Sequence, residues 1–194
     1  MFKKLGRASI NGKIDTKINI YCNDVVYKAI TEVSKYVLQE KLIKGIEKII
    51  DFHILEDNEQ KEINGKRYTF FDINAKGTKQ FGFETNINNK RLIFLGDETL
   101  NSKLNERVKN ADYVMHEAFC LDSEESIFGA YEKNHSTVKT ASQIMNELNV
   151  KNLILYHTEE SHGEERKELY TKEGKESFNG NIIVPNDLEE IEII

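Results

Sequence analysis

Residues 111–118 read ADYVMHEA and residues 153–157 read LILYH. Each contains a short apolar run that leads into a histidine, and such runs are typical of strands buried within a sheet. The segment between them contains Ser136-Thr137, which can cap a helix, followed by apolar residues at helical spacing. The second half of the chain is therefore predicted to be β-α-β, a connection that places the two strands parallel to each other.

The first half of the chain has weaker but similar signals. Residues 17–22 alternate polar and apolar side chains as a half-buried strand does, and Asn23-Asp24 can then begin a helix. Asn64-Gly65 and Asn88-Asn89 each separate two strand-like runs and predict two hairpins. Further strands are expected at residues 182–184 and 191–194. Hairpins early in the chain and β-α-β late in it indicate an α/β or mixed α+β class.

Length and composition indicate one folded domain that spans residues 1–194. The chain has a mass of 22.5 kDa, with 39% hydrophobic and 31% charged residues, which is enough to bury a core. It has no apolar run near the ~20 residues that span a bilayer, and no apolar segment behind its basic N-terminus that would make a signal peptide. Two cysteines are too few for a disulfide framework. We therefore expect a soluble, cytoplasmic protein that does not associate with membranes.

The net charge of -6 argues against an extensive nucleic-acid surface. Proteins that hold nucleic acids neutralise phosphates with clustered lysine and arginine, and no dense basic stripe is present in this sequence. The same charge opposes adhesion to anionic membranes.

Polar residues that can bind metals or transfer protons follow several of the predicted strands. Asp97 follows LIFL, His116-Glu117 follows YVM, and His157 follows LILY. His135 stands at the start of the predicted helix, whose N-terminal amides can hold an anion. Taken singly, each has a structural interpretation: a turn aspartate, a surface pair, a hydrogen-bonded core histidine or a decoration of a helix start. Their shared position at strand ends favours a site, and their ligand types suit zinc or another first-row metal.

These segments together carry a family resemblance. LGDET at 95–99, ADYVMHEA at 111–118, HST at 135–137 and LILYH at 153–157 resemble, in this order, the C-terminal half of the metallo-β-lactamase superfamily, and most closely its ribonuclease Z-like branch. The resemblance implies an αββα sandwich. This chain would supply the C-terminal half of that sandwich plus helices, so the fold is expected to be incomplete and the domain N-terminally truncated.

The resemblance also implies metal ligands. Asp97 would bridge two metal ions, and His157 would ligate one of them. The position of a further family histidine falls on Asn74, and asparagine is a poor zinc ligand. The main metal motif of the family, His-x-His-x-Asp-His, does not occur in the 194 residues. The expected cofactor is zinc or manganese, with one or two ions in a complete site and none in a degenerate one.

Catalytic and substrate-binding roles follow from the same resemblance. His116 would assist proton transfer at the scissile phosphate, and Glu117 would orient it. His135 and Ser136 would line the pocket near the substrate phosphate.

The resulting hypothesis is a metal-dependent hydrolase that acts on a phosphodiester or another ester of a small molecule. Transfer RNA is a weaker candidate substrate, because the chain lacks the cationic surface that would grip it. One alternative is a truncated or degenerate non-catalytic member of the superfamily without a complete metal site. A third interpretation, a nucleotide-binding module at Ser136-Thr137, lacks a glycine-rich phosphate cradle. Half a sandwich would expose one apolar sheet face, so we expect a homo-oligomer or association with a missing N-terminal half.

Overall fold

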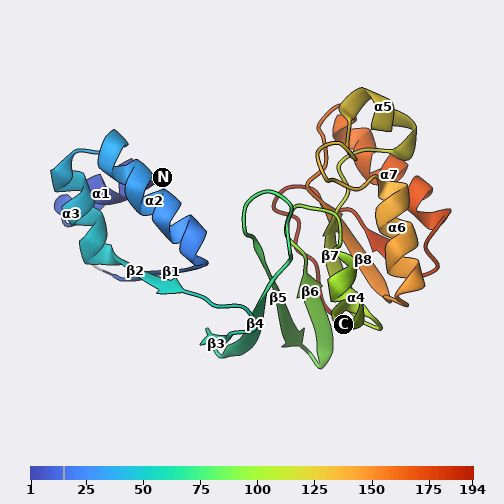
Figure 1. The fold of residues 1–194 in the computed structure, drawn as a ribbon, viewed down its shortest axis with the longest axis horizontal. Coiled ribbons are helices and arrows are strands. Elements are labelled where there is room, and N and C mark those ends of the chain that lie inside the picture. Colours follow the sequence, from blue (N-terminus) through green and yellow to red (C-terminus); the bar gives the residue numbers. More distant parts are fainter. Residues whose placement is uncertain (15) are drawn as a thin grey trace. The chain divides into compact units, whose positions relative to one another are not determined.

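The computed structural model describes residues 1–14 and 16–194, and Figure 1 shows its helices and strands. These residues form two compact units, Met1–Asp57 and Asn58–Ile194. Each unit has its own sheet and its own apolar cluster, and each is described by itself. One truncated domain over residues 1–194 stays a prediction.

The first unit is a small parallel β-α-α-β arrangement preceded by a helix. Its elements are α1 (Phe2–Ile10), β1 (Ile18–Cys22), α2 (Asp24–Val37), α3 (Glu40–Ile49) and β2 (Ile50–Ile54). β1 and β2 pair in parallel. The Asn23 side chain accepts a hydrogen bond from the Val26 amide at 2.9 Å, which caps α2 as its sequence predicts. The buried core of this unit is small and consists mainly of Ile46, Ile49 and Ile50.

The second unit is built on a seven-stranded sheet in which the strands follow one another in chain order. The strands are β3 (Gln60–Ile63), β4 (Lys66–Asp72), β5 (Phe81–Ile87), β6 (Lys90–Phe94), β7 (Tyr113–Glu117), β8 (Asn152–Tyr156) and β9 (Asn181–Ile183). Pairing is antiparallel from β3 to β6 and parallel from β6 to β9. The sheet therefore changes from hairpins to crossovers at β6, as the order of the sequence signals predicts.

Both predicted hairpins are confirmed. Asn64 and Gly65 connect β3 to β4 with φ angles of 51° and 75°. Asn88 and Asn89 connect β5 to β6 with φ angles of 51° and 61°. Two consecutive residues with positive φ match the twist of antiparallel strands, and asparagine and glycine tolerate this conformation best.

The helices of the second unit pack against the sheet to form its main core. They are α4 (Asn105–Val108), α5 (Glu125–Phe128), α6 (Val138–Glu147) and α7 (Arg166–Lys175), and short 3-10 turns precede α4, α5 and α7. The predicted β-α-β unit is confirmed as β7, α6 and β8. Thr137 and Thr140 form a capping box at the start of α6. Val114, Met145 and Leu153, one from each of these elements, are completely or almost completely buried in one cluster.

The predicted strand at residues 191–194 is wrong. This segment has no regular secondary structure, although Ile191 and Ile193 pack against the buried cluster of Leu92, Tyr113 and Ile154. Asn88 donates a side-chain hydrogen bond to the Ile193 carbonyl at 2.9 Å. The apolar residues are therefore used for packing on the sheet, without a ladder of backbone hydrogen bonds.

The sheet face opposite the main core is also apolar. Phe83, Phe94 and Tyr156 stack side by side on it, with ring centroids 5.2 and 5.4 Å apart. Self-association, or association with a further half of a sandwich, stays a prediction. None of the helices within residues 1–14 and 16–194 combines the length and apolar character needed to cross a bilayer.

Candidate functional site

The candidate site lies at the carboxyl edge of the parallel strands. Glu117 ends β7, His157 directly follows β8, and Asp97 follows β6 after a two-residue interval. Glu117 and Tyr156 are partners in the β7–β8 register, so the strand ends are level with each other. His135 comes from the segment just before α6. Segments that are far apart in the sequence therefore lie close together in space, as expected at the edge of an open parallel sheet.

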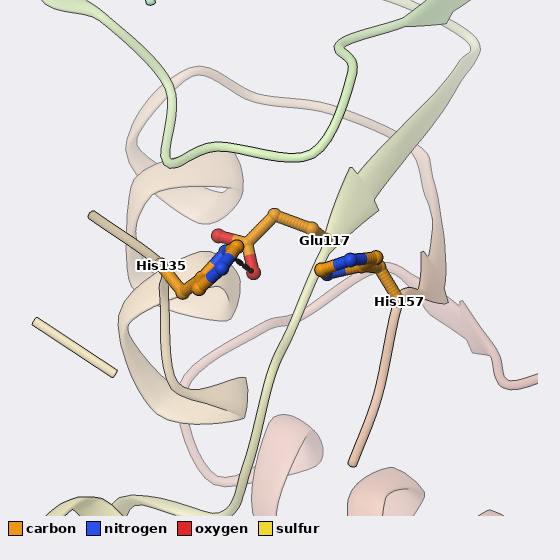
Figure 2. A group of neighbouring side chains, drawn as sticks. All are labelled: Glu117, His135 and His157. Carbon is orange, nitrogen blue, oxygen red and sulfur yellow. Dashed lines mark ion pairs between the residues drawn. The ribbon is translucent and has the colours of Figure 1, made fainter. Parts of the chain in front are cut away.

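Glu117, His135 and His157 form a compact group of side chains (Figure 2). Each offers one ligand atom, and these atoms lie within 4.8 Å of one another. The Glu117 Oε2 atom is 3.5 Å from His135 Nδ1, and the rings of His135 and His157 have centroids 5.0 Å apart. Two imidazoles and a carboxylate at this spacing form a ligand set that suits zinc and related metals.

Glu117 is buried at the base of this group. Its Oε1 atom accepts a hydrogen bond from the Ser136 amide at 2.5 Å, whereas Oε2 is buried without a hydrogen-bond partner. Burial raises the pKa of the carboxyl group to about 8, and the negative charges of Asp97 and Glu98 raise it further, against the lowering effect of Ser136. Such a group accepts a cation or shares a proton more readily than a solvated carboxylate does.

Asp97 and His135 also have buried polar atoms without partners. These atoms are Asp97 Oδ1 and His135 Nδ1. Burial lowers the pKa of His135, and the neighbouring His157 lowers it further, so the ring stays neutral at neutral pH. Because buried polar groups are hydrogen-bonded in the great majority of cases, several orphaned atoms at one strand edge indicate a site that receives a further group.

His157 is held in an unusual backbone conformation. Its φ angle is 53°, in the left-handed region that a histidine seldom adopts, and its side chain is exposed. The chain therefore turns sharply at His157, directly after the last residue of β8. Strained positions of this kind cluster at functional sites, where the surrounding structure holds them.

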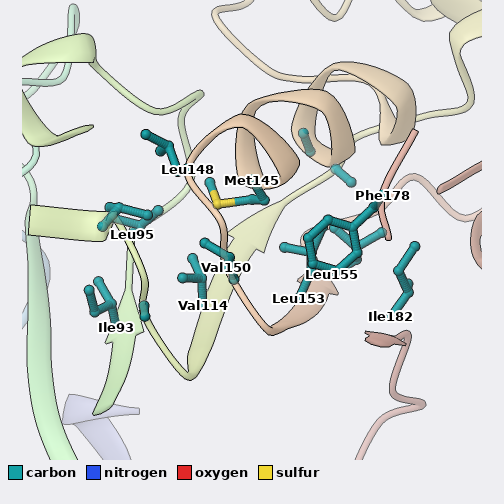
Figure 3. Packing of buried hydrophobic residues seen from close by; sticks show 14 of the residues in the cluster. Ile93, Leu95, Val114, Met145, Leu148, Val150, Leu153, Leu155, Phe178 and Ile182 are labelled. Atoms are coloured by element: carbon teal, nitrogen blue, oxygen red, sulfur yellow. The ribbon is translucent and has the colours of Figure 1, made fainter. Parts of the chain in front are cut away.

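His116 differs from this group, although it is next to Glu117 in sequence. It shares its face of β7 with Val114, which belongs to the core beneath α6 (Figure 3). The Leu100 amide donates to His116 Nε2 at 3.1 Å, and Nδ1 donates to the Glu117 carbonyl at 2.5 Å. Complete burial lowers the pKa of His116 to about 4. The ring is a neutral imidazole whose two nitrogens both bond to the backbone.

The expected orientation of His116 by Glu117 stays a prediction that these contacts do not support. The Glu117 carboxylate faces His135, and only its backbone carbonyl contacts His116. Alternation along a strand is the physical reason, since consecutive side chains point to opposite faces of the sheet. A catalytic role for His116 stays a prediction that this geometry does not support.

The family of the chain follows from comparison with known proteins. The family described as "Beta-lactamase superfamily domain" matches residues 5–158. The chain belongs to this superfamily. Ribonuclease Z from Archaeoglobus fulgidus is 32% identical over 104 residues, which make up 54% of this chain and 33% of that protein. The chain spans about a third of the length of the curated ribonuclease Z relatives that it matches first.

Solved structures of the superfamily have the same fold. A metallo-beta-lactamase fold protein from Bacillus subtilis has a TM-score of 0.66 at 16% identity, and the match covers 95% of this chain and 68% of that chain. The short form of human tRNase Z has a TM-score of 0.63 at 17% identity, with 100% of this chain and 73% of that chain covered. The expected metallo-β-lactamase-like fold and the resemblance to the ribonuclease Z-like branch are thereby confirmed.

Asn74 and Ser136 are both bound to their surroundings by hydrogen bonds. The Asn74 side-chain amide donates to the Asp72 carbonyl at 3.1 Å, and the Asn74 φ angle is 57°. Its amide group thus stabilises a turn after β4, and a role as a metal ligand stays a prediction. Ser136 is buried and donates from Oγ to Thr99 Oγ1 at 2.8 Å. This hydroxyl therefore links the segment before α6 to the loop after β6.

Two neighbours of the group were not predicted from the sequence. Phe119 stacks on His135, with ring centroids 5.0 Å apart and ring planes 21° from parallel, and limits the movement of the imidazole. Thr99 joins the loop after β6 to Ser136. Thr99 belongs to the same LGDET segment as Asp97, which was the one available signal, whereas nothing in the sequence around Phe119 distinguishes it from a core phenylalanine.

Proposed function

We propose that this chain is the part of a metal-dependent hydrolase that holds a metal ion and delivers a proton to an ester oxygen. The observation that carries the proposal is the convergence of Glu117, His135 and His157 at one strand edge, with buried atoms of Glu117 and His135 left without hydrogen-bond partners. Membership of the β-lactamase superfamily supports the same reaction class.

The donor set fits a divalent ion. Asp97 and His157 are the proposed metal ligands, and the unpartnered Oδ1 of Asp97 is a carboxylate oxygen of the kind that such an ion binds. A bound zinc or manganese ion would supply Lewis acidity and lower the pKa of a coordinated water. One ion is proposed at Asp97 and His157. A second ion would use the ligand atoms of Glu117 and His135 beside His157, in place of the proton transfer described next.

Glu117 and His135 are proposed to handle the proton. The Ser136 amide holds one oxygen of Glu117, and the other oxygen faces His135 Nδ1. Phe119 packs flat against the His135 ring and limits its rotation. Held in this way, the neutral His135 ring can take up at Nδ1 the proton that the Glu117 carboxyl group holds and pass a proton from its other nitrogen to the leaving-group oxygen. The role expected for His116 therefore passes to His135.

A phosphodiester is the favoured substrate class, with another ester of a small molecule as the alternative. Several relatives are named ribonuclease Z, a name that refers to cleavage of RNA. The net charge of -6 argues against an extended RNA surface on this chain alone. We therefore propose a small phosphodiester as the substrate for testing, and transfer RNA stays the weaker candidate.

Hydrolysis of bis(p-nitrophenyl) phosphate with added zinc or manganese tests the proposal. We expect metal-dependent release of p-nitrophenol, a loss of about 10²-fold or more for His135→Ala, and a similar loss for Asp97→Asn. Lys167→Ala is the matched control, because its partner Glu189 lies in an exposed surface pair. A folded, metal-loaded chain that hydrolyses the ester no faster than the buffer would refute the enzyme and favour the non-catalytic alternative.

A further inference from the structure

A second group of ligand-type side chains lies outside the site described above. It consists of Glu124, Glu159 and His162, which we call the Glu124 group. Glu124 ends the 3-10 turn Asp122–Glu124, and the other two residues belong to the loop that follows β8. Their ligand atoms lie within 4.8 Å of one another. His162 Nε2 is 2.8 Å from Glu124 Oε1 and 4.0 Å from Glu159 Oε1.

The Glu124 group carries more negative charge than its own imidazole can balance. Within the described residues, no lysine or arginine pairs with Glu124 or Glu159. Two carboxylates therefore share one histidine, which is charged only when protonated. The same negative charge acts on the buried thiol of Cys120. Burial raises the pKa of this thiol most, and Glu124 and Glu159 are among the carboxylates that raise it further. Like charges at this spacing are relieved by a proton or by a metal cation.

Glu124 supplies an independent indication of a missing partner. Its Oε2 atom is buried and has no hydrogen-bond partner, while Oε1 faces His162. An orphaned carboxylate oxygen is costly unless a further group binds it. The unpaired atom belongs to the residue that is closest to the imidazole, so a single bound ion could satisfy both.

Glu159 is already held in place for such a role. Its side chain is only 8% exposed. Its two carboxylate oxygens accept hydrogen bonds from the Ser161 amide at 2.7 Å and the Ser161 hydroxyl at 2.6 Å. Its backbone amide donates to the Phe119 carbonyl at 2.7 Å, which fixes the loop to the end of β7. Hydrogen-bonded ligands of this kind keep their orientation and lose little freedom on binding a metal.

We propose that Glu124, Glu159 and His162 bind one divalent first-row metal ion, separate from the ion proposed at Asp97 and His157. Two carboxylates and one imidazole leave a coordination position for water, and they are ligand types that zinc and manganese accept. The ion replaces the proton that His162 otherwise shares with Glu124. It joins the loop that follows His157 to the 3-10 turn before α5, so it stabilises the loop and takes no part in the hydrolysis proposed above.

Zinc binding by the purified chain tests this inference, with zinc chloride as the probe and metal content measured by mass spectrometry of the folded protein. A His135→Ala, His157→Ala variant, called the first-group variant, removes both histidines of the group formed with Glu117, and we expect it to keep one equivalent of zinc. Adding His162→Gln and Glu124→Gln to that variant should remove this equivalent or weaken its binding by at least about tenfold. His53→Gln is the control, because His53 lies in the first unit and bonds to Asn19.

Each outcome decides the inference independently of the proposed hydrolase. Retention of one zinc by the first-group variant, and its loss after the two further substitutions, supports the second metal site. A first-group variant that binds no zinc overturns it, and the Glu124 group is then an ion pair that holds a proton only. Equal zinc binding with and without His162→Gln and Glu124→Gln overturns it as well. Circular dichroism of every variant shows that the fold is intact, and the cobalt(II) absorption spectrum gives a second readout of the same ligands.

Discussion

The two sides of strand β7 at its carboxyl end present neighbouring residues in opposite states. On the side of the main core, His116 uses both ring nitrogens in backbone hydrogen bonds. At the open edge, Glu117 has one carboxylate oxygen bonded to Ser136 and the other buried without a partner. Both residues are completely buried, so burial alone does not separate them. The difference is that the core side is saturated with hydrogen bonds, whereas the open edge has unused polar atoms.

This difference separates a residue whose polar atoms are all used by the fold from a residue that is proposed to act in the site. A buried imidazole with two backbone partners contributes to folding and has no free nitrogen for a metal or a proton transfer. A buried carboxylate with a free oxygen beside two histidines has the opposite properties, because it costs stability and offers a ligand atom. The residues that the sequence places side by side as one His-Glu unit are therefore expected to respond differently to substitution.

The largest expected effect is that of His116→Ala on stability. The substitution leaves a cavity and removes the partners of the Leu100 amide and the Glu117 carbonyl. We expect the free energy of unfolding to fall by about 3–5 kcal/mol, as for other large-to-small changes in a core combined with unpaired backbone groups. Urea denaturation followed by circular dichroism measures this loss.

His135→Ala is the matched comparison for that variant. His135 has an unpartnered Nδ1 atom and is 16% exposed at its side chain. Its removal should cost much less, about 1 kcal/mol or below, while it reduces hydrolysis. Equal losses of stability in the two variants would contradict the distinction between the two sides of β7.

In metal-free protein, His116 and Glu117 should change the stability in opposite directions as the pH rises. The folded pKa of His116 is lowered from 6.5 to about 4, so its contribution is present above pH 6.5 and is lost as pH falls through 4, by an amount on the order of 3 kcal/mol. The folded pKa of Glu117 is raised from 4.5 to about 8, so its contribution is present below pH 4.5 and is lost as pH rises through 8.

Urea denaturation between pH 4 and pH 9 in the presence of a chelator measures this profile. Between pH 4.5 and 6.5 the two trends oppose each other in the wild-type protein. Glu117→Gln removes the ionisable carboxyl group, so its stability should rise from pH 4 to pH 6.5 and then stay level. If the free energy of unfolding of the Glu117→Gln variant falls as steeply between pH 6.5 and pH 8 as that of the wild type, another group causes the loss of stability at alkaline pH.

A smaller effect is expected for Thr99→Val, which tests the link between the loop after β6 and the segment before α6. The variant keeps the shape of the side chain but removes the hydroxyl that accepts from Ser136 Oγ at 2.8 Å. We expect a loss of about 1 kcal/mol in the free energy of unfolding, the usual contribution of one hydrogen bond. Ser136→Ala in the same background should then cost little more, because the two hydroxyls act as one pair. Additive losses in this double-mutant cycle would show that the bond contributes nothing.

Much of the fold could be predicted from the sequence because local signals agreed with the tertiary structure. Each of these signals depends only on residues that are close in sequence. Examples are the apolar runs at β7 and β8, the capping threonine of α6 and the asparagine turns. Helix α1 gave no such signal. It contains Gly6, which lowers helix propensity, and Gly6 is needed because a Cβ atom there would lie 2.7 Å from the Leu42 carbonyl oxygen. The helix therefore depends on its packing against α3, which the sequence of α1 alone does not reveal.

The candidate site was predictable as a set of segments but not as a set of contacts. The strand-end positions of Asp97, Glu117 and His157 follow from the hydrophobic pattern. The choice between His116 and His135 as the partner of Glu117 depends on which face of β7 each side chain occupies and on the path of the segment before α6. The position of His162 was equally hidden, because a charged loop has no periodicity that predicts its neighbours.

The smallest effect is expected at His157, where the open edge includes backbone strain. His157→Ala and His157→Gly both remove the imidazole from the first group, but only glycine adopts the φ angle of 53° without strain. We expect His157→Gly to be more stable than His157→Ala by about 1 kcal/mol, with both variants within about 1 kcal/mol of the wild type, because the histidine side chain is exposed. Thermal and urea unfolding of metal-free protein measure the difference.

A more stable glycine variant would mean that the histidine costs stability in the turn that follows β8. Such a cost is expected if the imidazole serves as the proposed metal ligand. A glycine variant less stable than the alanine variant would show that the turn carries no strain and would remove this argument for a functional His157.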